Sequence, residues 1–246
     1  MNEIVKMILI VLLIIVIIFI VLRFTSTGSN VLSKCHSGQK ATEITPDKLG
    51  GNSNSNNYAY SIWFYLADWS YRLGDTKTLF SRGAYSTMSS QVNPLVTFDS
   101  YQNNITISTT TYRDQPPPGG GGAVMPSTSN SECTIQNFPI QKWVNLIVSL
   151  NSRTLDIYLD GKLVRTCILP GTAKISPSSS VYVTPDGGFD GWTSNFQYFS
   201  NPLNPHEAYA IYKEGSKCGG MGSFFDKYSL RLTYLVNNVA QNSITI

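Results

Sequence analysis

The sequence predicts an all-β protein, an antiparallel jelly-roll β-sandwich preceded by one apolar helix, and three observations lead to this prediction. Short segments of alternating apolar and polar residues recur along most of the chain after residue 57. Asp160–Gly161 and Asp186–Gly188 are typical of tight turns between strands. Beyond the apolar helix, only Asn204–Glu214 carries the signals of a helix. Short strands joined by tight turns are typical of sandwiches and not of helical or α/β folds.

Three successive strands in Lys142–Cys167 form the predicted nucleus of the sandwich. Apolar residues alternate with polar or mixed ones over 144–150, and the alternation returns over 155–159 after a polar turn. Asp160–Gly161 then predicts a two-residue hairpin turn, because glycine tolerates the positive φ that such a turn requires. The return strand runs to Cys167. We expect three antiparallel neighbours here.

The remaining strands follow from the same alternation. They are predicted at Tyr58–Leu66, Thr78–Arg82, Leu95–Tyr101, Ile105–Tyr112, Ser180–Val183, Thr193–Phe199 and Leu230–Val236. In the single short helix, Asn204 is the expected N-cap, Pro205 fits the first turn, and Glu207 completes a capping box.

The N-terminal region predicts a membrane anchor. Met7–Leu22 is an unbroken run of sixteen apolar residues, and with its flanks it makes about 29 Å of helix. A cleaved signal peptide is the alternative, but the run is longer than a usual signal core and Arg23–Phe24 follows it instead of a small-residue cleavage site. We predict a transmembrane anchor over residues 1–24, a Ser/Asn/Gly-rich stalk over 25–57 and the sandwich over 58–246.

The orientation of this anchor receives conflicting signals. Lys6 precedes the apolar run, whereas Arg23, Lys34 and Lys40 follow it, which weakly places the C-terminal domain in the cytosol. Paired cysteines would instead indicate an oxidising compartment, or a virus with its own thiol oxidation system.

Four cysteines predict two disulfides. Cys133 precedes the first strand of the nucleus and Cys167 ends the third, so that neighbouring antiparallel positions bring them together. Cys35 and Cys218 pair by elimination. Four reduced thiols are the alternative.

Arg113–Glu132 predicts a long loop, because its proline run and its glycine run do not fit a regular strand. Loops of this length in compact domains are functional or disordered. The segment is either a mobile insertion or an arm that contacts a neighbouring subunit. The expected contact residues are Arg113, Gln115, Pro116, Pro117 and Pro118.

Catalytic and metal-binding residues are sparse. No predicted strand carries the paired carboxylates that glycoside hydrolysis needs. Neither His36 nor His206 has a nucleophile motif nearby. The sequence also has no C-x-x-C pair that could form a zinc site with these histidines. We therefore expect no enzymatic activity and no resident cofactor. Calcium is left open, with weak candidate ligands in loops at the rim of the sandwich: Asp99, Asp186 and Asp190.

Four aromatic residues are candidates for stacking against a sugar: Trp69, Tyr71, Tyr85 and Trp192. The alternative is that they pack in the core, where aromatic residues of a sandwich usually lie. Nucleic acid is not an expected partner, because the net charge is only +3 and Lys and Arg are scattered singly.

Two sequence blocks resemble a known fold family. The run W-V-N-L-I-V-S-L followed by L-D-I-Y-L-D-G-K-L-V, within 143–164, resembles the middle of concanavalin A-like lectin/glucanase domains of the laminin-G type. F-D-G-W-T-S-N-F-Q-Y-F at 189–199 is similar to a late strand of the same family, and Leu203–Glu207 resembles its closing helix. The resemblance spans about 57–215 and implies the fold, which hosts lectins, hydrolases and adhesive modules alike.

The chain as a whole also resembles membrane-anchored laminin-G-like proteins of large icosahedral DNA viruses of algae and protists. The shared features are the anchor, the Asn/Ser-rich stalk and the core at 143–167. This resemblance implies a non-catalytic minor capsid protein that ties the inner membrane of the virion to its shell through contacts with other capsid or membrane proteins. The alternative is a lectin-like adhesion module that binds a glycan at a cell-surface or lumenal membrane. A glycoside hydrolase is a distant third.

Overall fold

The computed structural model of the protein describes residues 11–15, 17, 31–50, 56–83, 91–112, 128–218, 231–236 and 239–245. The chain divides into two compact units, Met1–Val31 and Leu32–Ile246. In the first unit, residues 11–15 and 17 are α-helical. Among the described residues, no helix combines the length and apolar character needed to cross a bilayer. Most of the anchor predicted at Met7–Leu22 lies outside the described residues, so it stays a prediction.

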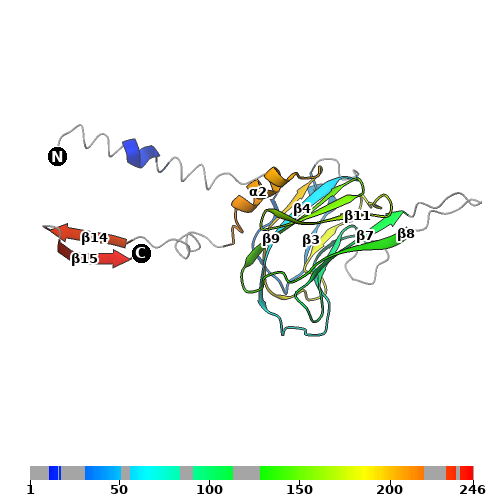
Figure 1. Ribbon diagram of the computed structural model, residues 1–246, viewed down its shortest axis with the longest axis horizontal. Helices are drawn as coiled ribbons and strands as arrows, with labels where there is room; N and C mark the ends of the chain where they lie inside the picture. Colours follow the sequence, from blue (N-terminus) through cyan, green and yellow to red (C-terminus); the bar gives the residue numbers. More distant parts are fainter. Residues whose placement is uncertain are drawn as a thin grey trace, which may run out of the picture. The chain divides into compact units, whose positions relative to one another are not determined.

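Two antiparallel sheets form the body of the second unit (Figure 1). The larger sheet has the order β1 (Val31–Ser33), β13 (Asp190–Phe199), β4 (Tyr58–Asp68), β9 (Trp143–Asn151), β10 (Thr154–Leu159) and β11 (Lys162–Ile168), and β2 (His36–Ser37) also pairs with β13. The smaller sheet has the order β3 (Thr42–Ile44), β12 (Val181–Val183), β5 (Lys77–Arg82), β6 (Leu95–Phe98), β7 (Ile105–Tyr112) and β8 (Thr128–Ile135). The predicted all-β class is confirmed.

The core lies between the two sheets. In β4 the alternate residues from Tyr58 to Leu66 are buried and belong to one large apolar cluster. Rings of β4 meet rings of the smaller sheet across this space: Phe64 lies 5.2 Å from Phe98, and Tyr60 lies 5.5 Å from Phe80, between ring centroids. Burying one such side chain contributes about 1.5–3 kcal/mol. The other face of β4 is therefore free to point away from the core.

The predicted nucleus is confirmed as β9, β10 and β11. Asp160 and Gly161 have φ values of 49° and 73°, as a twist-matched hairpin turn requires. The Asp160 carboxylate accepts a hydrogen bond from the Asn145 backbone N–H at 2.9 Å. A Cβ at position 161 would lie 2.9 Å from the Tyr212 Cβ, so the glycine is also required where the helix packs over this turn.

Helix α2 (Pro205–Lys213) covers part of the outer face of the larger sheet. Its predicted capping box is present: the Asn204 side chain accepts from the Glu207 N–H at 3.0 Å, and the Glu207 carboxylate accepts from the Asn204 N–H at 2.9 Å. Ala208 and Ile211 pack against Ile147 of β9 and its neighbour on β10. These contacts fix the place where the chain leaves the helix.

Part of the predicted stalk instead belongs to the sandwich. Within residues 25–57, the structure places β1, β2 and β3 at sheet edges, followed by the 3₁₀-helix η1 (Pro46–Lys48). Ile44 and Leu49 are buried in the core. The polar composition misled the prediction because short edge strands bury only an occasional side chain and gain their order from backbone pairing with a neighbour.

The predicted arm is also shorter than expected. Thr128–Glu132, which we assigned to the loop, lies in β8 and pairs with β7 along its length. The Thr106 and Thr134 hydroxyls hydrogen-bond across this pair at 3.0 Å, so Ser/Thr-rich sequence here forms an edge strand. The contact residues Arg113 and Gln115–Pro118 lie outside the described residues.

Near the C-terminus, the strand predicted at Leu230–Val236 is present as β14 (Arg231–Val236). It pairs with β15 (Val239–Thr245) in a two-stranded sheet of its own and joins neither sheet of the sandwich.

Both predicted disulfides are present. Cys133 on β8 is bonded to Cys167 on β11, with 6.2 Å between their Cα atoms. Because β8 and β11 are edge strands of the two sheets, this bond closes one side of the sandwich. Cys35 is bonded to Cys218, with 5.1 Å between their Cα atoms. No cysteine is free.

Candidate functional site

Three aromatic side chains form a row across the outer face of the larger sheet. Trp192 on β13 is the register partner of Tyr65 on β4, and Tyr65 is the register partner of Trp143 on β9. Directly opposed residues of neighbouring strands project to the same face. Since Phe64 and Leu66 point into the core, this face is the outer one. We call Trp192, Tyr65 and Trp143 the aromatic platform.

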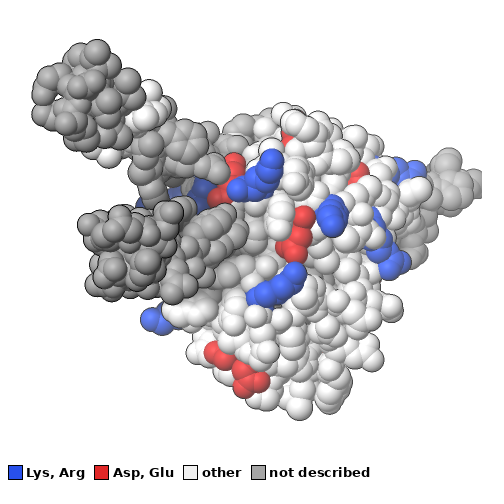
Figure 2. All heavy atoms as spheres, turned by 60° about the vertical axis from the view of Figure 1, so that its left-hand side comes forward, with Lys and Arg blue, Asp and Glu red and all other residues white. Residues whose placement is uncertain are grey.

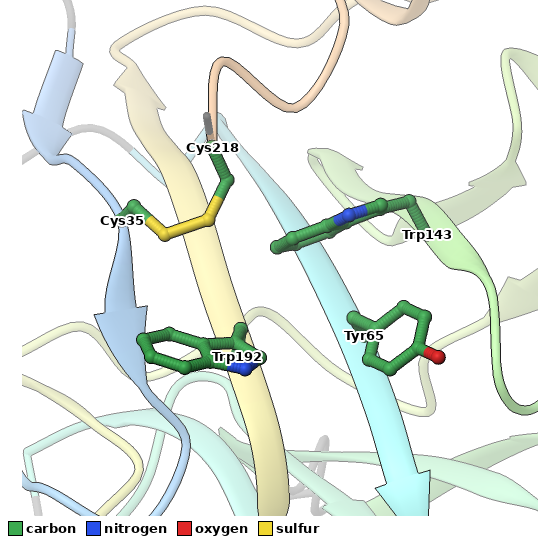
Figure 3. A pocket seen from close by; sticks show the side chains of 5 residues that line it. All are labelled: Cys35, Tyr65, Trp143, Trp192 and Cys218. Carbon is green, nitrogen blue, oxygen red and sulfur yellow. A yellow bond between two sulfur atoms is a disulfide. The ribbon is translucent and has the colours of Figure 1, made fainter. Parts of the chain in front are cut away.

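The platform lines an open cavity of about 390 Å³ (Figure 3). The rings of Tyr65 and Trp143 lie 5.8 Å apart between centroids and are tilted by 52°. Trp192 is 50 % exposed. The disulfide between Cys35 and Cys218 completes the lining on one side. The walls of this cavity are therefore two indoles, a phenol ring and a disulfide.

Gly191 explains how Trp192 reaches this position. Its φ is 148°, and a Cβ there would lie 1.9 Å from the Tyr65 carbonyl oxygen. Only glycine lets β13 approach β4 so closely at this irregularity in the register. The Gly191 carbonyl also accepts a hydrogen bond from the Gly38 N–H at 2.7 Å, which holds the loop after β2 beside the platform.

The chain that follows α2 runs along β13 next to the platform. We call Glu214–Cys218 the strap. The Ser194 hydroxyl donates to the Ser216 carbonyl oxygen, the Asn195 side-chain amide donates to the Gly215 carbonyl oxygen at 3.2 Å, and the Gln197 side-chain amide donates to the Glu214 carboxylate at 3.4 Å. The strap ends in the disulfide that lines the cavity.

Charged side chains contribute little to the face shown in Figure 2, where they form small separate groups among uncharged atoms. The strongest electrostatic perturbation lies in the core. Burial raises the pKa of Tyr58 and Tyr60, and the nearby Arg82 guanidinium opposes this rise. Arg82 donates a hydrogen bond to the Tyr60 hydroxyl at 3.3 Å. These tyrosines stay neutral and serve the interior of the sandwich.

Of the predicted sugar-stacking residues, Trp192 lies in the cavity. Trp69 instead packs against Phe138, with 6.1 Å between centroids, and carries the Lys77 ammonium 5.0 Å from its ring. The Tyr71 hydroxyl donates to the Gly187 carbonyl oxygen at 3.2 Å. Tyr85 lies outside the described residues.

Tyr65 and Trp143 were missed by sequence reasoning. The alternation over Tyr58–Leu66 separates Tyr65 from the apolar side chains of its strand, and Trp143 begins a strand, but neither pattern gives the register between strands far apart in the sequence. The same is true of the position of the disulfide between Cys35 and Cys218 beside them.

The weak calcium candidates take part in local turns. Asp99 accepts hydrogen bonds from the Tyr101 N–H at 3.1 Å and from the Ser100 hydroxyl at 3.3 Å, and the Tyr101 hydrogen bond is the main cause that lowers its pKa. The Asp190 side chain accepts from Gln39 at 2.9 Å. Asp186 accepts from Arg72 through its backbone oxygen.

Within the part of the chain that the structure describes, no three His, Cys, Asp or Glu residues gather as metal ligands would. His206 lies exposed in the first turn of α2, and His36 pairs through its backbone with Thr193.

The fold and the cavity define an antiparallel β-sandwich with an open aromatic cavity on the outer face of its larger sheet. Comparison with solved structures agrees on the fold. The chain is similar to the binding domain of botulinum neurotoxin serotype D (13 % identity, TM-score 0.50) and to the receptor-binding domain of the C/D mosaic serotype (14 %, TM-score 0.50). It is also similar to the binding domain of botulinum neurotoxin DC in complex with SialylT (14 %, TM-score 0.50). Each match covers 73 % of this chain and 41–42 % of the other.

Sequence comparison gives a more limited likeness. The chain is 32 % identical over 124 residues to the BEACH domain-containing protein lvsD of Dictyostelium discoideum. The match covers 43 % of this chain and 4 % of that protein. No protein-family model matches the chain.

Proposed function

We propose that the protein is a non-catalytic glycan-binding module that stacks a sugar ring on the aromatic platform. The observation that carries this proposal is the in-register row of Trp192, Tyr65 and Trp143 in an open cavity, with Trp192 half exposed. Aromatic side chains that lie together on an outer face, and do not pack into the core, are typical of a binding surface.

Sugars suit this surface for a physical reason. One face of a pyranose ring presents C–H groups, which pack on the electron-rich face of an aromatic ring, while the hydroxyl groups around its edge stay hydrogen-bonded. The cavity volume of about 390 Å³ falls within the range of about 300–1,000 Å³ that is typical of small-ligand sites. The residues that line the cavity carry no charged side chain, so an uncharged glycan meets little competition from bound ions.

Binding without chemistry fits the lining of the cavity. Its residues are Cys35, Tyr65, Trp143, Trp192 and Cys218, and they include no carboxylate or imidazole. Glycoside hydrolysis uses two carboxyl groups on either side of the scissile bond. We infer that the protein holds its glycan without cleaving it.

The similar neurotoxin structures support the choice of a binding role over a capsid role. They are binding domains, and one of them is in complex with SialylT. With the predicted anchor at Met7–Leu22, the module would be displayed on a membrane, at the surface of a cell or in a lumen. The minor-capsid role at the inner membrane of a virion stays the alternative proposal, and its expected partners are other capsid or membrane proteins.

A glycan array tests the proposal. The full-length protein should bind one family of glycans, and Trp192→Ala should weaken that binding about 30-fold, since truncating an aromatic anchor costs about 2 kcal/mol. Trp192→Phe should retain part of the affinity. Tyr101→Ala is the matched control, because Tyr101 is 71 % exposed but does not line the cavity. Equal loss in both alanine variants, or no binding by the wild type, would refute the proposal.

A further inference from the structure

The strap covers three polar side chains that directly follow the platform on β13. Ser194, Asn195 and Gln197 are between 0 and 2 % exposed although they lie on the outer side of the sheet. Irregular register between Ser194 and Gln197, together with a φ of 47° at Asn195, lets the consecutive residues Ser194 and Asn195 both contact the strap, while Phe196 between Asn195 and Gln197 packs in the core. A row of hydrogen-bonding groups therefore begins at Ser194, two residues after Trp192 of the platform.

The contacts of the strap are those that a bound sugar would make. Each of the three polar side chains donates one hydrogen bond to the strap, and the acceptors are two backbone carbonyl oxygens and the carboxylate of Glu214. The Gln197 amide also donates to the Asn195 side-chain oxygen at 3.3 Å. The Gln197 side-chain oxygen is buried and has no hydrogen-bond partner among the described residues. A sugar hydroxyl can accept from such donors and donate to that oxygen, which the strap does not do.

The strap is held to β13 by three hydrogen bonds and to Cys35 by the disulfide, but it contributes no buried side chain to the core. None of its residues is buried, and Lys217 is exposed. The ion pair between Lys217 and Glu214, at 2.8 Å, is internal to the strap. Segments with few buried apolar contacts open most readily. The covalent bond from Cys218 to Cys35 is therefore the strongest restraint on the strap, because the three hydrogen bonds can be exchanged for those of a ligand or of water.

We propose that the strap is a redox-released cover over a polar subsite, formed by Ser194, Asn195 and Gln197, which takes the next sugar unit of an extended glycan. This proposal rests on the proposed function, because the first unit stacks on the platform. The oxidised protein then binds single sugars or chain ends, and reduction of the bond between Cys35 and Cys218 admits a longer chain.

The chemistry requires a dithiol reductant. One thiolate of the dithiol attacks a sulfur of the Cys35–Cys218 bond and forms a mixed disulfide, and its second thiol then displaces the protein sulfur. The dithiol leaves as a disulfide, and the protein gains two electrons and two protons as two thiols. Both cysteines line an open cavity, whereas Cys133 of the other disulfide is 1 % exposed. The disulfide between Cys133 and Cys167, with Cys133 buried and Cys167 partly exposed, serves as the internal control for the rate of reduction.

The experiment compares oxidised and reduced full-length protein. The probes are glucose, galactose, N-acetylglucosamine and sialic acid, and linear oligomers of these sugars with two to six units. Under limiting dithiothreitol, mass spectrometry should find alkylated thiols at Cys35 and Cys218 before Cys133 and Cys167. Affinity for oligomers should then rise about tenfold relative to affinity for single sugars.

Two variants repeat the test without a reductant, so that incomplete reduction of the disulfides cannot affect the result. Cys35→Ser with Cys218→Ser should show the raised oligomer affinity without any reductant. Adding Gln197→Ala to this double variant should remove the gain for oligomers. Hydrogen exchange of the backbone amides at 214–218, which needs no ligand, should rise in the double variant.

The outcomes separate the two proposals. Sugar binding that is identical in the oxidised protein and in the double variant overturns the subsite and leaves the platform standing. Faster exchange of the strap without a gain for oligomers also overturns the subsite. Absence of binding in every state overturns both.

Discussion

At the residue scale, glycine and aspartate determine the local geometry around the candidate site. Gly191 brings two strands together beneath Trp192, and Gly161 makes room for Tyr212 of the helix. The sequence showed both glycines, but only the second was predicted to have a role, because the pair Asp160–Gly161 is a turn signal in itself. The need for Gly191 comes from a strand that is distant in the sequence.

Replacing Gly191 should therefore destabilise the fold. In Gly191→Ala the new Cβ would meet the Tyr65 carbonyl oxygen at 1.9 Å, and φ is 148°. We expect a loss of about 3 kcal/mol of unfolding free energy, measured by urea denaturation. Gly50→Ala is the control, since a Cβ there has no neighbour within 4 Å, and its effect should stay within about 0.5 kcal/mol. Equal stability of the two variants would contradict the close approach.

A second residue-scale prediction concerns acid stability. The backbone hydrogen bond from Tyr101, the largest cause, lowers the pKa of Asp99 below 3.8. A carboxylate with a lowered pKa stabilises the fold above its unfolded pKa, and this contribution is lost as the pH falls through the folded pKa. Asp99→Asn keeps the acceptor oxygen but cannot titrate. Its urea midpoint should depend less on pH below about pH 4 than that of the wild type, and parallel curves would count against this role.

At the element scale, long strands and the capped helix could be predicted from the sequence, whereas the short edge strands could not. The strand at Tyr58–Asp68 and the capped helix carry their signals within a few residues. β1, β2 and β3 are only two or three residues long, which is too short to show an alternation of buried and exposed side chains. They are held by backbone pairing with β12 and β13, which lie far away in the sequence. The segment itself shows only a composition rich in Ser, Gly and Asn, and it was therefore assigned to a stalk.

The helix cap gives an element-scale prediction. Asn204→Ala removes the acceptor for the Glu207 N–H and should cost about 1 kcal/mol of unfolding free energy. His206→Ala, an exposed change in the same turn, should stay within about 0.5 kcal/mol. Thermal or urea unfolding of the two variants measures the difference. If the cap contributed nothing, their unfolding curves would coincide.

At the scale of the whole molecule, the disulfide between Cys133 and Cys167 joins the edge strands of two sheets. The two cysteines are 34 residues apart in the sequence, so the bond limits the unfolded chain and should stabilise the fold by about 3–4 kcal/mol. Cys133→Ala with Cys167→Ala should show this loss in urea. A loss below about 1 kcal/mol would mean that the other contacts between β8 and β11 suffice.

The whole-molecule prediction from sequence was right about the fold class and incomplete about the site. Patterns within strands predicted the sandwich, and Trp192 was a candidate. The platform, however, requires the order β13–β4–β9, which joins residues 65, 143 and 192. Such long-range register is not encoded in any one segment.

Titration of the four indole N–H signals by NMR tests the central claim most directly. The four tryptophans of the chain divide into two pairs: Trp143 and Trp192 line the cavity, whereas Trp63 and Trp69 do not. Adding the glycan selected on the array should shift the first pair with one common dissociation constant and leave the second pair in place. Shifts confined to Trp63 and Trp69, or binding with no indole shift, would contradict a sugar stacked on the platform.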